Sequence, residues 1–81
     1  MKIRVTQEHI DNGEKGACNC CPIALALIDA GWKRPHVGMN TMHDKDDESK
    51  YFATPPQVFR FMACFDIDRL VHPFEFELDA A

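Results

Sequence analysis

The sequence has no long hydrophobic run. No stretch of its 81 residues approaches the roughly 18 to 20 apolar positions that a membrane-spanning helix requires. The first five residues, Met1 to Val5, lead into polar residues instead of the apolar segment of a signal peptide. We therefore expect a cytoplasmic protein with no membrane partner.

Positive charge is also scarce. Nine Lys and Arg stand against 13 Asp and Glu, a formal net charge of −4. Proteins that hold nucleic acid through phosphate contacts carry an excess of positive charge, so this balance argues against direct nucleic-acid binding and favours a partner with a basic surface. Four acids form a loop that we interpret first as a solvated turn and second as a contact for such a partner: Asp44, Asp46, Asp47 and Glu48.

Recognisable catalytic motifs are missing. The sequence contains no Gly-x-Ser-x-Gly and no His-Glu-x-x-His, and its glycines match neither a Walker loop nor a dinucleotide fingerprint. A chain of this length has room for one domain, which we expect to cover residues 1–81. Its core must be thin, so self-association or a bound ligand would add stability. We predict a protein that is not an enzyme and that can form a homo-oligomer.

Two helices and a helical turn are predicted from local signals. Thr6 is a good N-cap for a turn over 7–11 that ends at a left-handed Asn12-Gly13 pair. Pro22 begins a helix that runs to residue 30, and because this helix is apolar almost all round we expect it to be covered on more than one face. In the second helix, Thr54 as N-cap, Pro55 at the first position and Gln57 at the third form a capping box. Its apolar stripe is Val58, Phe61, Met62 and Phe65.

The remaining patterns indicate strands. Residues 1–5 alternate between apolar and basic, 36–43 are extended, 51–53 return as a hairpin partner, and 70–78 alternate Phe with Glu after an edge Pro73. The order strand, helix, strand, strand, helix, strand is the βαββαβ order of ferredoxin-like folds. We therefore predict an α+β domain in which one sheet carries two helices on a single face.

Three of the four cysteines gather at the start of the first helix. Cys18 and Cys21 have the Cys-x-x-Cys spacing of zinc sites, which need two more ligands. The candidates are Cys64 and His9, with His36, His43 and His72 also open. A redox site is disfavoured, because more than ten residues separate the first strand from the motif. We favour the interpretation that Cys20 and Cys21 are small core residues, so we predict no cofactor and keep zinc as the alternative.

A possible ligand site lies in two neighbouring segments. The loop at Cys18 and Asn19 precedes a helix N-terminus, where backbone N–H groups can hold an anion. Trp32, Lys33 and Arg34, with His36, form an aromatic and basic cluster that could stack on a base and bind a phosphate. The favoured alternative for this cluster is a Trp that anchors the helix exit while its neighbours are solvated.

Three segments resemble a family of small bacteriophage and bacterial proteins: Val5 to Gly13 (VTQEHIDNG), Cys21 to Leu27 (CPIALAL), and Phe65-Asp66 with Val71 to Leu78 (VHPFEFEL). The resemblance brings no catalytic residue or cofactor. It implies a phage or prophage accessory protein, a class in which small domains commonly bind and block host machinery. We therefore expect a protein of the host cytoplasm that inhibits or redirects a host factor, most often in anti-defence. The alternatives are a protein that sequesters a nucleotide signal and a zinc-stabilised interaction module.

Overall fold

The fold is of the α+β class, as the sequence predicts. This computed structural model describes residues 1–78, so the last three positions of the predicted 1–81 domain lie outside the described residues. The described elements are, in chain order, β1 (Lys2–Val5), α1 (Gln7–Asn12), α2 (Pro22–Asp29), β2 (Pro35–Val37), β3 (Thr41–Asp44), β4 (Asp47–Ala53), α3 (Pro56–Asp66) and β5 (Phe74–Glu77).

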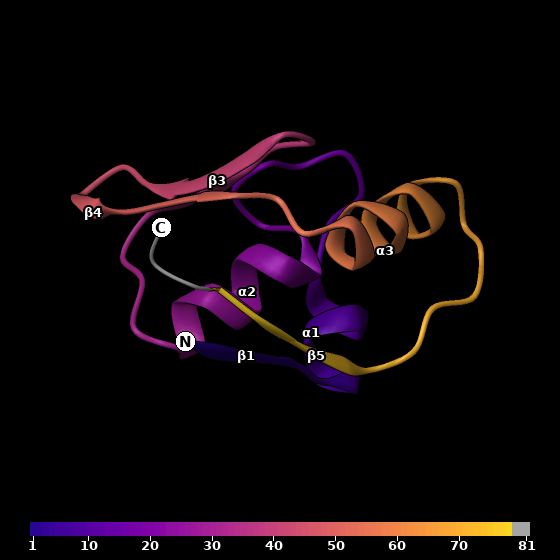
Figure 1. The fold of residues 1–81 in the computed structure, drawn as a ribbon. Helices are drawn as coiled ribbons and strands as arrows, with labels where there is room; N and C mark the ends of the chain where they lie inside the picture. Colours follow the sequence, from indigo (N-terminus) through magenta and orange to yellow (C-terminus); the bar gives the residue numbers. More distant parts are fainter. Residues whose placement is uncertain (79–81) are drawn as a thin grey trace.

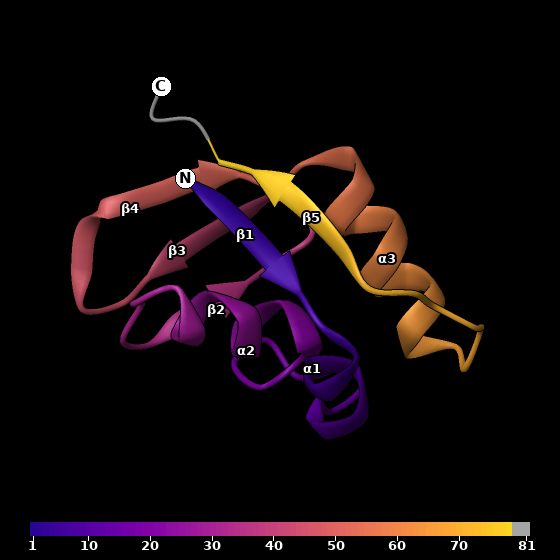
Figure 2. The same ribbon diagram turned by 90° about the horizontal axis from the view of Figure 1, so that it is seen from below.

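The strands form two antiparallel sheets, so the predicted single sheet of a ferredoxin-like βαββαβ domain is wrong. Within residues 1–78, β1 pairs with β5, and β2, β3 and β4 form a separate sheet. Helix α2 lies between the two sheets and contacts both β1 and β2 (Figure 1). Seen from below, β1 and β5 cross in front of the three-stranded sheet, and α3 closes one side (Figure 2).

The composition of α2 explains this arrangement. Five of its eight residues are buried: Pro22, Ile23, Ala24, Ala26 and Leu27. A helix that is apolar on several faces must be covered on several faces. One sheet with both helices on the same face would leave part of α2 in water, whereas two sheets bury it from both sides. The expected burial on more than one face is therefore confirmed, and it is the reason why the single-sheet prediction fails.

The middle of the chain contains one more strand than predicted. The 36–43 segment is split by a turn in which the Gly38 N–H donates to the Thr41 carbonyl at 2.9 Å, so β2 and β3 form a hairpin. The predicted acidic loop is largely strand: Asp44 ends β3, and the return strand β4 begins at Asp47, before the predicted residue 51.

Helix α1 has the predicted N-cap. The Thr6 hydroxyl accepts the His9 N–H at 3.3 Å, and the Thr6 N–H donates to the His9 imidazole at 3.0 Å. The predicted left-handed stop at Asn12-Gly13 is wrong, because Gly13 has an extended backbone with φ of −73°. Glycine is required there for space, since a Cβ would lie 2.5 Å from Cδ of Pro22.

Helix α3 has the predicted apolar stripe but not the predicted cap. Val58, Phe61 and Phe65 are buried, and Met62 packs against the core. No side chain caps the helix, and its N-cap is Pro55, because Pro56 disfavours the helical conformation in the residue before it.

The last strand is shorter than predicted. β5 covers only Phe74–Glu77, and Leu70, which the prediction placed in the strand, is 82% exposed. The alternation within the strand holds: Phe76 is buried opposite Ile3, while Glu75 faces solvent and pairs with Arg4 at 3.0 Å.

Candidate functional site

The strongest candidate site is an apolar groove between α3, the β2–β3 turn and the loop that precedes α2. It encloses about 240 Å³. We call it the α3 groove. Its lining residues are Gly16, Ala17, Cys18 and Cys21 from the loop, Val37, Gly38 and Met39 from β2 and the turn, and Phe59, Met62, Ala63, Phe65 and Asp66 from α3.

Three hydrogen bonds, each with at least one backbone partner, hold the walls of the α3 groove together. The Val37 N–H donates to the Cys18 carbonyl at 2.8 Å, which fixes the loop against β2. The Gly16 N–H donates to a carboxylate oxygen of Asp66 at 3.0 Å, which fixes the loop against the end of α3. The third wall is fixed by Thr54, whose hydroxyl donates to the Gly38 carbonyl at 2.8 Å. This contact also explains why Thr54 does not cap α3.

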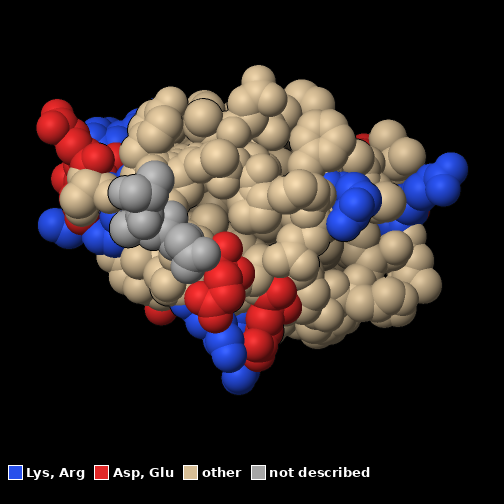
Figure 3. Space-filling view, viewed as in Figure 1, with Lys and Arg blue, Asp and Glu red and all other residues tan. Residues whose placement is uncertain are grey.

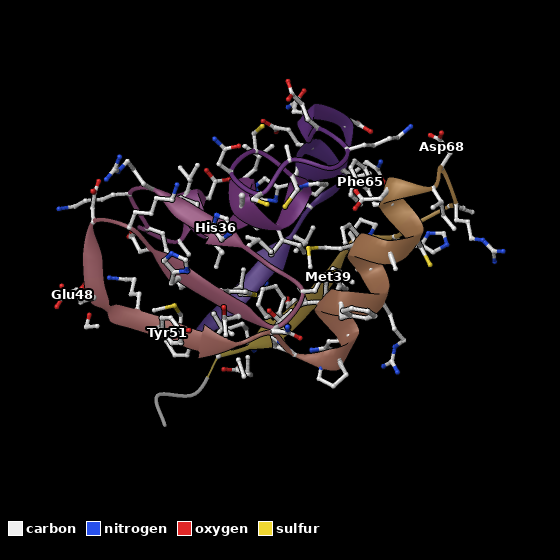
Figure 4. All side chains as sticks on the ribbon, turned by 90° about the horizontal axis from the view of Figure 1, so that it is seen from above. His36, Met39, Glu48, Tyr51, Phe65 and Asp68 are labelled. Atoms are coloured by element: carbon white, nitrogen blue, oxygen red, sulfur yellow. The ribbon has the colours of Figure 1, made fainter. Side chains whose placement is uncertain are left out.

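Two large apolar side chains are exposed at the groove. Met39 is 66% exposed and Phe59 is 39% exposed. Seen from above, Met39 lies between the three-stranded sheet and α3, on the side of the molecule that also displays His36 and Tyr51 (Figure 4). In the side view most of the visible surface is uncharged, and the charged groups gather at the left, at the lower centre and on the right (Figure 3). Exposed apolar side chains around an apolar hollow are typical of interaction sites.

The cysteines are not one cluster. Cys18 is exposed, Cys21 is buried at the N-cap of α2, and both line the α3 groove. Burial raises the pKa of the Cys21 thiol. Cys20 points elsewhere and donates to the Glu14 carboxylate at 3.3 Å, a hydrogen bond that raises the pKa of the Cys20 thiol. The prediction that Cys21 is a core residue is confirmed, whereas Cys20 is only half-buried.

The four zinc candidates are not brought together. His9 is buried and holds Asp29 at 2.5 Å, which ties α1 to α2, and Cys64 does not line the groove that contains Cys18 and Cys21. Within residues 1–78 no group of three or more His, Cys, Asp or Glu side chains could hold a metal ion.

Three backbone positions near the predicted anion site at Cys18 and Asn19 offer no free N–H. Pro22, the first residue of α2, has no N–H, and the Ala24 N–H already donates to the sulfur of Cys21 at 3.5 Å. The Gly16 N–H is bound to Asp66, as described above. Two N–H groups near this loop, those of Gly16 and Ala24, are thus already bound within the protein.

The aromatic and basic cluster is also built differently from a ligand site. Trp32 is 2% exposed and stacks on Phe52 at a centroid distance of 6.0 Å. Its indole N–H donates to the sulfur of Met1 at 3.4 Å. This matches the interpretation of Trp32 as an anchor at the helix exit, and it leaves no indole face for a base. Lys33 and Arg34 are exposed.

The four acidic residues have different environments. Asp44 is buried and accepts the backbone N–H groups of Lys33, Arg34 and Asp46. The Asp46 side chain pairs with that of Arg34 at 2.8 Å. The Lys50 ammonium, followed by Ser49, lowers the pKa of Asp47 to about 2 through hydrogen bonds. Asp44 is thus structural, while Glu48 is exposed at the start of β4.

Two features were not predicted from the sequence. One is that Met39 and Phe59 lie with Met62 of the predicted stripe along one groove. The other is a row of rings across β2, β3 and β4: the His36 and His43 rings are 5.1 Å apart, and the His43 and Tyr51 rings are 5.8 Å apart. Alternation in the three strands places these rings on one face.

Comparison with known proteins identifies no relative: no protein-family model, no curated protein and no solved structure matches the chain. Among the helices of residues 1–78, none is long and apolar enough to cross a membrane.

Proposed function

We propose that this protein acts by binding a partner protein in the α3 groove, as a small phage-type accessory protein that inhibits or redirects a host factor. The observation that carries the proposal is the groove itself, an apolar hollow beside which Met39 and Phe59 are exposed. A small domain with a thin core loses stability when apolar side chains face water, so their exposure is best explained by a partner that covers them.

The groove favours a particular kind of partner segment. Met39 and Met62 are flexible side chains that adapt to different apolar partners. Asp66 adds an exposed carboxylate to the lining of the α3 groove, and one oxygen of this carboxylate accepts the Gly16 N–H. We therefore expect a segment that inserts apolar side chains and carries a Lys or Arg beside them, which also agrees with the net charge of −4. Sequestration of a nucleotide signal has less support, because Trp32 is buried.

Selection of random displayed peptides on the immobilised protein tests the groove. We expect enrichment of apolar segments next to a basic residue, and loss of that enrichment in Phe59→Glu. Tyr51→Glu is the matched control, since Tyr51 is an exposed aromatic side chain outside the groove. Equal enrichment by wild type and Phe59→Glu would refute the groove as the binding site.

A second experiment tests the inhibitory role. A host factor captured from bacterial lysate by the wild-type protein, and not by Phe59→Glu, is purified and its activity is measured with each variant. We expect wild type to alter that activity and Phe59→Glu to leave it unchanged. A captured factor whose activity and targeting are unaffected by the wild-type protein would refute inhibition and redirection.

A further inference from the structure

Four of the residues that line the α3 groove carry sulfur. Cys18 and Cys21 come from the loop before α2, Met39 from the β2–β3 turn and Met62 from α3. We propose that this cavity binds one monovalent copper ion, Cu(I), through the two cysteine thiolates with the two methionine thioethers as supporting ligands. This inference goes beyond the proposed function and does not rest on it.

The chemistry of the donors selects the metal. Thiolate and thioether sulfur are soft ligands, and together they select Cu(I) over hard or borderline divalent ions. Structural zinc requires four thiolate, imidazole or carboxylate ligands, and residues 1–78 contain no group of even three. The one carboxylate that lines the cavity, that of Asp66, accepts the Gly16 N–H.

The position of the two thiols suits uptake and retention of the ion. Cys18 is exposed and can meet an incoming ion, whereas Cys21 is 5% exposed. The burial of Cys21 shields its sulfur from water. The exposed Met39 side chain lies in a turn, where its thioether can rotate onto the ion from outside.

Charge and protons balance in the binding step. Cu(I) replaces the two thiol protons, which pass to solvent, and forms two copper–sulfur bonds with no change of oxidation state. One positive ion and two thiolates leave a single negative charge. That charge lies at the N-terminus of α2, where the Ala24 N–H already donates to the sulfur of Cys21 and the helix dipole is positive. The negative charge of Asp66 repels the negative charge of the copper–thiolate group. The hydrogen bond that Asp66 accepts from the Gly16 N–H reduces this repulsion.

The test is an anaerobic titration of the reduced full chain against the coloured complex of Cu(I) with bicinchoninate. We expect the wild-type protein to withdraw one copper per chain and Cys18→Ser/Cys21→Ser to withdraw none. Met39→Leu and Met62→Leu should each weaken binding by about 10- to 100-fold, the scale of supporting contacts in metal sites. Cys20→Ser and Cys64→Ser are the matched controls and should bind as wild type, because neither side chain lines the cavity.

Serine is itself a good N-cap, so the Cys21 substitution should preserve α2, which circular dichroism can verify. Cys18→Ser alone, at an exposed position, provides the same test without touching the cap. Three results would each overturn the proposal: no copper withdrawn by wild type, equal loss in the Cys20 or Cys64 control, or stoichiometric Zn(II) binding of similar strength. The peptide selection uses metal-free protein with chelator present, so the groove and the copper site can fail independently.

Discussion

Replacing Asp44 by Asn should remove one of the main polar supports of the β2–β3 hairpin. The buried carboxylate accepts three backbone N–H groups, from Lys33 at 2.9 Å on one oxygen and from Arg34 at 3.1 Å and Asp46 at 2.9 Å on the other. An amide keeps one acceptor oxygen and turns an NH₂ group toward the remaining donor, so at least one bond is lost and two donors face each other. A hydrogen bond to a charged group contributes about 1.5 to 3 kcal/mol, so we expect a loss of about 2 to 3 kcal/mol in the free energy of unfolding.

Urea unfolding at pH 7 measures this loss, and thermal unfolding should show a Tm lower by roughly 10 to 20 °C in a domain of this size. Asp46→Asn is the matched control, because Asp46 is exposed and its ion pair with Arg34 lies at the surface. Exposed ion pairs contribute little, so the control should lose much less stability. Equal losses in the two variants would refute the structural role of Asp44.

The pH dependence provides a second check on Asp44. Burial alone would raise the pKa of its carboxyl, but the three N–H donors outweigh burial and hold the pKa below its ordinary value. The carboxylate therefore stabilises the fold above the unfolded pKa of about 3.9, and this contribution is lost as the pH falls from there through the folded pKa. The stability difference between wild type and Asp44→Asn should be full at pH 7 and shrink toward about pH 2. A difference that stays constant over this range would contradict the assignment.

Three further predictions follow from close contacts and exposure. Gly13→Ala should lower the free energy of unfolding, measured in urea, by about 1 to 3 kcal/mol, the usual cost of overpacking. The new Cβ would lie 2.6 Å from the backbone nitrogen of Pro22, which cannot rotate away. Unchanged stability would contradict this close approach of Gly13 to Pro22. A thiol reagent should label Cys18 first and Cys21 last, because Cys18 is exposed and Cys21 is buried with a raised pKa, and peptide mass spectrometry would detect the opposite order. The Asp47 carboxyl should titrate by NMR with a pKa of about 2, and a midpoint near the ordinary value of 3.8 would show that its hydrogen bonds do not form in solution.

Local signals predicted the elements well where the cause of the structure is local. Pro22 begins α2, Thr6 caps α1, and the burial of Phe76 beside the exposed Glu75 follows the alternation of the last strand. In each case the information lies within a few residues, in the missing N–H of a proline, a hydroxyl that reaches the next turn, or the two-residue period of a strand.

Predictions failed where a distant segment competed for the same group. Thr54 has the sequence context of an N-cap, but its hydroxyl donates to the Gly38 carbonyl. Gly13 was expected to supply a left-handed backbone and instead makes space for Pro22. Trp32 differs from these two cases, because the favoured interpretation was an anchor at the helix exit and the ring does stack on Phe52 inside the core.

At the candidate site too, local sequence signals were informative and contacts between distant segments were not predicted. The sequence marked Cys18 and Cys21 by their spacing and named Cys64 and His9 as candidate partners in the zinc alternative, because those residue types coordinate zinc. The fold instead places both cysteines in a groove with Met39 and Met62, which lie some 18 and 41 residues farther along the chain than Cys21. Spacing identifies groups that are close in sequence and has no information about side chains that another turn or helix brings to the same groove.

By itself, the sequence determined the α+β class, the position and burial of α2, and the two faces of β1 and β5, because hydrophobic periodicity and backbone preferences act within single elements. Only the tertiary structure decided that the strands form two sheets and that loop, turn and α3 enclose a groove. The physical reason is that the apolar surface of α2 can be covered in more than one way, and the choice depends on strand pairings between segments as distant as β1 and β5.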